Sequence, residues 1–170
     1  MIQIEEVKNS SDLKKFVKFP FKLYKDSKYW VPPIISEEIN IFNSNVNPTL
    51  KNANVSLYIA IIGNEIVGRI AAIINSIEVN EQKVKKIRFG WFDVIDDLNV
   101  TRKLIDKVIE IGKANNLEYM EGPMGFSNLD KVGVLTYGFD KIGTMITWYN
   151  HPYYSSHFKK LNFKVEKQYL

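Results

Sequence analysis

Apolar and polar residues repeat along this chain with two different periods, which predict strands in some segments and helices in others. Alternation over residues 2–7 is the period of a half-buried strand. The clearest hairpin joins residues 55–62 to residues 66–74 through a glycine-containing turn. Residues 86–95 predict another strand, and Gly90 in its middle indicates a bulge or a close backbone approach.

Helical spacing of the apolar residues marks four further segments. A first helix should follow the N-cap side chains at residues 9–12, and Pro20 should break or kink it. A short helix is expected over residues 35–42. The most regular helix should begin after Asp97, which is its predicted cap. A last short helix has Pro152 in its first turn, where proline is tolerated.

The order of these elements predicts the fold class. Further strands are expected over residues 117–121, 144–148 and 163–170. Three consecutive strands can pair as an antiparallel meander, and the later strand–helix–strand crossover should give a parallel pair. We therefore expect an α/β (α+β) fold: a mixed, mostly antiparallel sheet with helices on both faces. At 170 residues the chain fits one domain, residues 1–170.

Composition excludes several kinds of site. The chain has no cysteine, which excludes disulfides, thiolate metal sites and a cysteine nucleophile. Its two histidines lack the further ligands of a metal site, so none is expected. The N-terminal residues lack the apolar core of a secretory signal, and the apolar runs are shorter than the ~20 residues of a membrane span. We expect a cytoplasmic protein with no membrane partner.

The net charge of +4 is modest, but lysines crowd the first predicted helix. They are Lys14, Lys15, Lys18, Lys22, Lys25 and Lys28. A surface for nucleic acid is one interpretation of this cluster, and the solvated face of an amphipathic helix is the other. The second accounts for the lysines without a partner, so no nucleic-acid partner is expected.

Two local patterns connect this order of elements to a known superfamily. Asn150 is followed by a helical segment that ends in HFKKLNF at residues 157–163, and the kinked strand RFGWF at residues 88–92 runs straight into the long helix. Together they resemble the GNAT acyltransferase superfamily, whose terminal helix follows an asparagine and ends in FYEKLGF.

A second set of residues is similar to an uncharacterised group of bacterial GNAT-like proteins. These residues are Gly122-Pro123-x-Gly125-Phe126-Ser127, Asp130, Gly133, Tyr137-Gly138-Phe139-Asp140 and Asn150-x-Pro152-Tyr153-Tyr154. Members of that group continue past the last predicted strand. The chain is therefore expected to be one domain of a longer protein or a short member of the group.

The resemblance implies acetyl-CoA or another acyl-CoA as co-substrate, with its pyrophosphate at the start of the long helix. The expected cofactor-binding residues are Asn99, Val100, Thr101, Arg102 and Asn150. Residues 93–102 lack the glycines of the family's phosphate loop and carry three aspartates. A helix N-terminus still attracts anions, but Asp97 as a cap and Asp96 as a solvated carboxylate account for those two residues without a ligand.

The chemistry that the resemblance implies deprotonates an amine and protonates a leaving thiolate. Phe158 stands where the family motif has a tyrosine that often supplies this proton. Tyr154, one helical turn earlier on the same face, is the predicted acid, and a partly buried aromatic with a satisfied hydroxyl is the alternative. Asp93, where the kinked strand ends, is the predicted base, with Glu121 as its alternative.

Three other polar residues have structural expectations. His151 should cap the last helix, and His157 should lie on its surface. Arg69 can clamp a carboxylate or a phosphate, although an exposed position on the sheet is the more common one for a strand arginine.

Three functions follow from these observations. The first is a CoA-dependent N-acyltransferase that moves an acyl group, acetyl first, to a small amine or amino-acid-like acceptor. The second is a GNAT-fold module that binds a ligand or partner without transferase activity, which the missing glycines and Phe158 favour. A nucleic-acid-binding domain rests only on the lysines. The sequence determines neither the acceptor nor the oligomeric state.

Overall fold

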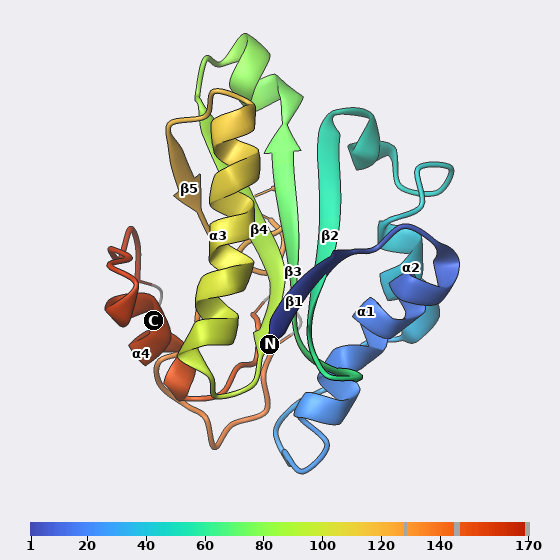
Figure 1. Cartoon of the computed structure of the whole chain (residues 1–170), viewed down its shortest axis with the longest axis vertical. Coiled ribbons are helices and arrows are strands. Elements are labelled where there is room, and N and C mark those ends of the chain that lie inside the picture. The colour runs from blue at the N-terminus through green and yellow to red at the C-terminus, as the bar shows by residue number, and fades with distance from the viewer. Residues whose placement is uncertain (128, 145–146, 169–170) are drawn as a thin grey trace.

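Within residues 1–127, 129–144 and 147–168, which this computed structural model describes, five strands form one sheet in the order β1-β2-β3-β4-β5 (Figure 1). The strands are β1 (Ile2–Glu6), β2 (Ala53–Ile62), β3 (Glu65–Asn75), β4 (Lys86–Val94) and β5 (Tyr119–Glu121). The helices are α1 (Ser10–Leu23), α2 (Ile35–Ile41), α3 (Leu98–Ala114) and α4 (Tyr153–Lys160). Short helical turns at Pro48–Lys51 and Ile77–Glu81 join the remaining elements.

Pairing in the sheet follows the predicted topology. β1 through β4 pair antiparallel with their neighbours, and β4 and β5, which α3 separates in sequence, pair parallel. The mixed, mostly antiparallel sheet is therefore confirmed. β5 contacts β4 only between Lys86 and Arg88 on the β4 side, so the second half of β4 extends beyond the end of β5.

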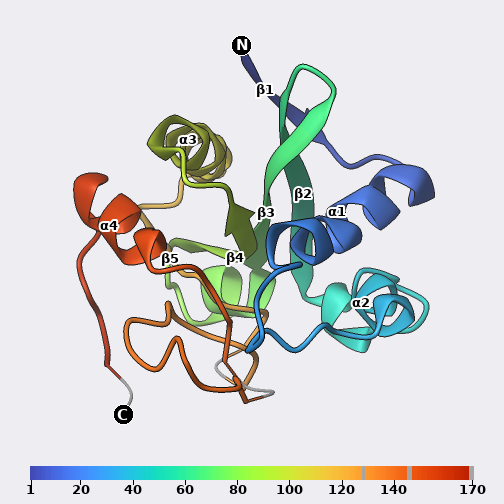
Figure 2. The ribbon, with the colours of Figure 1, turned by 90° about the horizontal axis from the view of Figure 1, so that it is seen from below.

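Helices cover both faces of the sheet, as the sequence predicts (Figures 1 and 2). One core lies beneath α3 and α4, and the other lies beneath α1 and α2. Successive residues of a strand point to opposite faces, so Ile70 and Ala72 of β3 enter the first core while Ala71 and Ile73 enter the second. Each fully buried isoleucine side chain contributes about 1.5–3 kcal/mol.

Two predictions about the chain's local structure are wrong: that Pro20 breaks the first helix, and that the described part of residues 163–170 forms a strand. Pro20 does not end α1, which continues to Leu23, and Pro20 itself is buried. Residues 163–168 are described but form no strand. Phe163 packs its ring on Phe89 and Phe158, and the side chains of residues 164–168 are exposed.

The predicted strand at residues 144–148 falls partly on positions outside the described residues. Of those that are described, Thr147 forms a single bridge with Val132. The connection from β5 to α4 is therefore built mainly of turns and bends.

Candidate functional site

β4 carries the predicted bulge in its middle. Arg69 of β3 lies opposite Asp93 and Ala71 lies opposite Gly90, so two residues of β4 face one residue of β3. Trp91 takes a positive φ of 43° there, which is uncommon for a bulky side chain. A Cβ on Gly90 would overlap the carbonyl oxygen of Met124, so the close backbone approach requires glycine at this position.

Beyond the bulge, Asp93 forms a buried ion pair with Arg69. The two side chains are only 8% and 5% exposed, and Nε of Arg69 lies 2.7 Å from Oδ2 of Asp93. Arg69 also donates through Nη1 to the carbonyl oxygen of Phe16 at 3.1 Å. The expectation that Arg69 lies exposed on the sheet is wrong, because helices cover both faces of β3. Its alternative role, the clamping of a carboxylate, is what the structure shows.

Tyr24, the residue after α1, connects Asp93 to Tyr154 of α4. Its hydroxyl donates to Oδ1 of Asp93 at 2.7 Å and lies 3.0 Å from the hydroxyl of Tyr154. Tyr154 in turn accepts the amide proton of Val94 at 2.8 Å. We call Tyr24, Arg69, Asp93 and Tyr154 the Asp93 network. It brings the predicted acid and the predicted base together through a third residue.

Both phenols of the Asp93 network stay protonated. Burial raises the pKa of Tyr24 well above its ordinary value, and the charge of Asp93 raises it further. Burial and the Asp93 charge likewise raise the pKa of Tyr154. Burial also raises the pKa of Tyr153, which donates to the carbonyl oxygen of Val94 at 2.6 Å. The two tyrosines of α4 thus satisfy both backbone groups of Val94, where β4 has no β5 partner.

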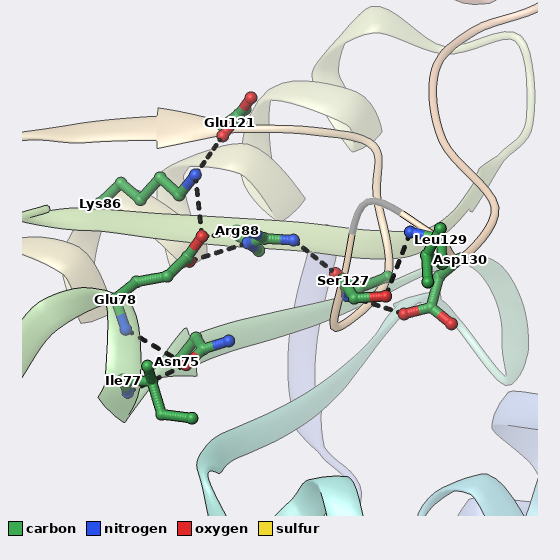
Figure 3. A network of polar contacts seen from close by, with 10 residues as sticks. Asn75, Ile77, Glu78, Lys86, Arg88, Glu121, Ser127, Leu129 and Asp130 are labelled. Atoms are coloured by element: carbon green, nitrogen blue, oxygen red, sulfur yellow. Dashed lines mark hydrogen bonds and ion pairs between the residues drawn. The ribbon is translucent and has the colours of Figure 1, made fainter. Parts of the chain in front are cut away.

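Glu121 belongs to a different group of charges (Figure 3). Its Oε2 lies 2.8 Å from Nζ of Lys86. Lys86 also forms an ion pair with Glu78, and Glu78 forms a second one with Arg88. Burial alone would raise the pKa of Glu78, but hydrogen bonds from Arg88 and Lys86 outweigh it and lower the pKa. Arg88, opposite Glu121 in the register, lies roughly 15 Å along β4 from Asp93. The structure therefore does not bring Glu121 to the Asp93 network.

The start of α3 is built from carboxylates rather than glycines. Asp97 caps the helix as predicted, because its side chain accepts the amide proton of Asn99 at 2.8 Å. The side chains of Val100 and Thr101 are buried, whereas Asn99 and Arg102 are exposed. Of the four residues expected here to bind a cofactor, two therefore direct their side chains into the protein.

His157 is buried, so the expectation that it lies on the surface is wrong. Its Nδ1 lies 2.8 Å from the hydroxyl of Thr101 and its Nε2 lies 3.1 Å from Asp96. Both ring nitrogens thus tie α4 to the first turn of α3. Asp96 has a partner, although its side chain is largely exposed.

Asn150 fastens the long loop before α4. Its side chain accepts from the amide of Leu135 at 2.6 Å and donates to the carbonyl oxygens of Leu135 and His151. A cofactor contact by Asn150 would have to replace one of these bonds. α4 has no side-chain cap, so the prediction for His151 is wrong; its Nε2 instead lies 3.4 Å from the carbonyl oxygen of Leu23.

Other features lie outside the Asp93 network. An open groove of about 540 Å³ contains Asn52, Asn80 and Asn115, none of which contacts the network. The six lysines of the first helical region are all exposed. No group of three metal-ligating side chains occurs among the described residues. No helix in the same part of the chain is long and apolar enough to cross a membrane.

Comparison with known proteins finds two bacterial relatives, although no protein-family model matches the chain. Protein YghO of Escherichia coli is 30% identical over 155 residues, which are 91% of this chain and 40% of that protein. The bacterial ceramide synthase of Caulobacter vibrioides is 28% identical over 141 residues, which are 82% of this chain and 36% of that protein. The chain thus spans about two-fifths of the length of the curated relatives it matches.

Solved structures decide the fold. A predicted acetyltransferase from Clostridium acetobutylicum, solved with acetyl-CoA, matches all of this chain and 94% of its own with a TM-score of 0.59 at 13% identity. A tandem GNAT protein from the clavulanic acid pathway matches 69% of this chain and 34% of its own with a TM-score of 0.52 at 10% identity. The chain has the GNAT fold. Identities this low extend to the fold alone, and the resemblance predicted from the sequence is confirmed at that level.

The sequence carries a signal for Arg69 as a member of the Asp93 network, but none for Tyr24. Arg69 stands inside an apolar run of a strand that is covered on both faces, and a charge in such a run needs a buried partner. Tyr24 carries no comparable signal, because only the packing of α1 against β3 and β4 brings its hydroxyl to Asp93.

Proposed function

We propose that this chain is an acyl-CoA-dependent N-acyltransferase domain. The observation that carries the proposal is the bulge in the middle of β4. At the end of the same strand, the amide of Val94 donates a hydrogen bond to the hydroxyl of Tyr154 in α4. A bulge leaves a backbone N–H outside the ladder, where it can polarise an acyl carbonyl. The acetyltransferases among the structures of the same fold support this reaction class.

The acceptor that we propose is an amine on a long-chain molecule. A ceramide is the amide of a fatty acid and a long-chain amino alcohol, and one relative that matches 82% of this chain is named a ceramide synthase. The same bond is formed when an acetyl group moves to a small amine, as the sequence suggested. Acyl and acceptor length are therefore the variables to test, while the chemistry at the thioester stays the same.

The reaction moves one proton. The amine nitrogen bonds to the acyl carbon and the carbon–sulfur bond breaks, so the amine loses a proton and the CoA thiolate gains one. Tyr154 is the proposed donor, because burial and the charge of Asp93 keep its phenol protonated. The raised pKa makes it a weaker acid than an exposed tyrosine. The Val94 amide, which stabilises the phenolate left behind, partly offsets this effect.

Asp93 is better suited to orient groups than to remove a proton. Oδ1 accepts from Tyr24 and Oδ2 pairs with Arg69, so both oxygens are engaged. The carboxylate is also the counter-charge of the buried Arg69 guanidinium, which has no other acidic partner among the described residues. We therefore propose that Asp93 aligns the two phenols and that the amine enters the site already neutral.

The nucleotide part of acyl-CoA has few of the predicted side chains available to it. The side chains of Asn99 and Arg102 are exposed at the start of α3. Two backbone amides there are already used, because the Asp97 side chain accepts from the amide of Asn99 and the Asp97 carbonyl oxygen accepts from that of Thr101. We propose that Arg102 supplies the charge contact to a phosphate. This arrangement also favours the second candidate, a GNAT-fold module that binds a ligand without transfer.

Calorimetry separates the two candidates. Wild-type protein is titrated with acetyl-CoA, a C16 acyl-CoA and free CoA, followed by an assay of thiol release with a small amine and with a long-chain amino alcohol. A CoA species that binds the folded protein, present at 100 times its Kd, should raise the free energy of unfolding by about 2.7 kcal/mol. Thiol release that requires an amine supports the transferase. Binding without release favours the module, and no response to any CoA species contradicts the transferase.

A further inference from the structure

The hydroxyl groups of Tyr154 and Tyr24 form a chain that ends on Asp93, and the number of available protons fixes its direction. A carboxylate can only accept, so Tyr24 donates its single hydroxyl proton to Oδ1 of Asp93. The oxygen of Tyr24 then has only lone pairs to offer Tyr154, 3.0 Å away. Tyr154 therefore donates to Tyr24, while its own oxygen accepts the amide proton of Val94.

The other possible acceptor for the proton of Tyr154 lies farther away than Tyr24. The carbonyl oxygen of Val94 lies 3.3 Å from the Tyr154 hydroxyl, but it accepts from Tyr153 at the shorter distance of 2.6 Å. If Tyr154 donated there, two hydroxyl oxygens would face each other at 3.0 Å with no proton between them. The direction from Tyr154 through Tyr24 to Asp93 is the one that satisfies every group.

Tyr24 is held firmly in this position. It is 2% exposed, and its backbone N–H donates to the carbonyl oxygen of Pro20 at 2.8 Å. Its ring contacts those of Trp30, Tyr149 and His151 at centroid distances between 5.0 and 5.4 Å. The phenol oxygen therefore stays where it is, and only its hydroxyl proton can rotate.

We infer that Tyr24 is a positioning residue that governs the proton of Tyr154, an inference that rests on the proposed function. As the carbon–sulfur bond breaks, the hydroxyl proton of Tyr154 turns from Tyr24 to the thiolate, which takes it. The resulting phenolate keeps the hydrogen bond from Val94 and gains one from Tyr24, whose hydroxyl proton rotates away from Asp93. The proton that the amine loses then restores the Tyr154 hydroxyl. One proton has passed from nitrogen to sulfur, and the net charge of the site is the same as before the reaction.

The variants Tyr24→Phe and Tyr154→Phe and the double variant test this role. Each keeps the ring and removes one hydroxyl. Tyr24→Phe should lower kcat on the order of tenfold, less than the roughly 10²–10⁴-fold loss expected for the general acid itself, with KM for acyl-CoA unchanged. It should cause no further loss when Tyr154→Phe is already present, because Tyr24 acts through Tyr154. Tyr58→Phe, a buried tyrosine of β2 outside the hydroxyl chain, is the matched control and should keep wild-type kcat.

The outcomes separate the inference from the proposed function. An unchanged kcat in Tyr24→Phe, or losses that multiply in the double variant, would overturn the positioning role while thiol release by the wild type still supports the transferase. If the wild type releases no thiol with any amine, the proposed function fails and the catalytic role of Tyr24 falls with it. In that case urea unfolding of the two single variants and the double variant tests the hydroxyl chain alone. Shifts of the urea midpoint that are not additive support the chain, and additive shifts overturn it.

Discussion

Arg69 donates a hydrogen bond to the carbonyl oxygen that Pro20 leaves without a helical partner. In a regular helix the N–H of residue 20 would bond to the oxygen of Phe16, and proline has no N–H. Nη1 of Arg69 lies 3.1 Å from that oxygen. The proline that should have broken α1 is therefore compensated from β3, and the same guanidinium holds Asp93 in the candidate site.

Breaking the Arg69–Asp93 pair on one side should strongly destabilise the protein. Arg69→Met leaves the Asp93 carboxylate and the Phe16 oxygen buried without their donor, and the free energy of unfolding should fall by about 3–5 kcal/mol. Urea unfolding measures the change. The exposed pair of Lys22 and Glu65 provides the control: Lys22→Met should change stability by less than about 1 kcal/mol. Similar losses in both variants would contradict the buried pair.

The bulge should tolerate no side chain at position 90. Gly90→Ala places a methyl group on the carbonyl oxygen of Met124, and we expect a loss of about 1–3 kcal/mol in the free energy of unfolding. Gly143→Ala is the control, because among the described residues the nearest atom to its Cβ would lie 4.0 Å away. Thermal unfolding of both variants tests the prediction, and a Gly90→Ala protein as stable as Gly143→Ala would show that the close approach is absent.

The Glu78 group should make the protein sensitive to acid. Arg88 and Lys86 lower the pKa of Glu78 below its ordinary value of 4.5, so the folded state binds this proton less tightly than the unfolded state. The stabilising contribution is complete above the unfolded pKa and is lost as the pH falls through the folded one. Unfolding free energies measured from pH 6 down to pH 3 should therefore converge for wild type and Glu78→Gln. Glu118→Gln, whose side chain is 68% exposed, should track the wild type throughout.

Tyr154→Phe should separate catalysis from binding. We expect turnover to fall by about 10²-fold or more, the usual range for loss of a general acid, with little change in acyl-CoA affinity. Calorimetry and steady-state kinetics on the same preparation provide the two readouts. Unchanged turnover would leave Tyr154 as a buried aromatic with a satisfied hydroxyl.

Local patterns predicted most of the fold. The hairpin of β2 and β3, the apolar stripe of α3 and its cap at Asp97 all depend on neighbouring residues, and each is confirmed. The bulge at Gly90 could be predicted in the same way, because a glycine in the interior of a strand often marks a bulge or a close backbone approach.

Long-range packing decided what the sequence could not show. The sequence places His157 on the surface of the last helix, but α4 turns it toward Thr101. The same holds for Tyr24, whose partners lie 69 and 130 residues away in sequence. Of the Asp93 network, the sequence pointed to Asp93 and Tyr154 as candidate site residues and to Arg69 as a possible carboxylate clamp, but not to Tyr24, which connects Asp93 to Tyr154.

Amide formation is the most direct test of the proposed acyl transfer. Purified protein is incubated with a C16 acyl-CoA and a long-chain amino alcohol, and the products are resolved by mass spectrometry beside a reaction with acetyl-CoA and a small amine. We predict an N-acyl product and one equivalent of free CoA per amide, both diminished in Tyr154→Phe. Binding of acyl-CoA with no amide from either pair of substrates would contradict the transferase and leave a GNAT-fold binding module.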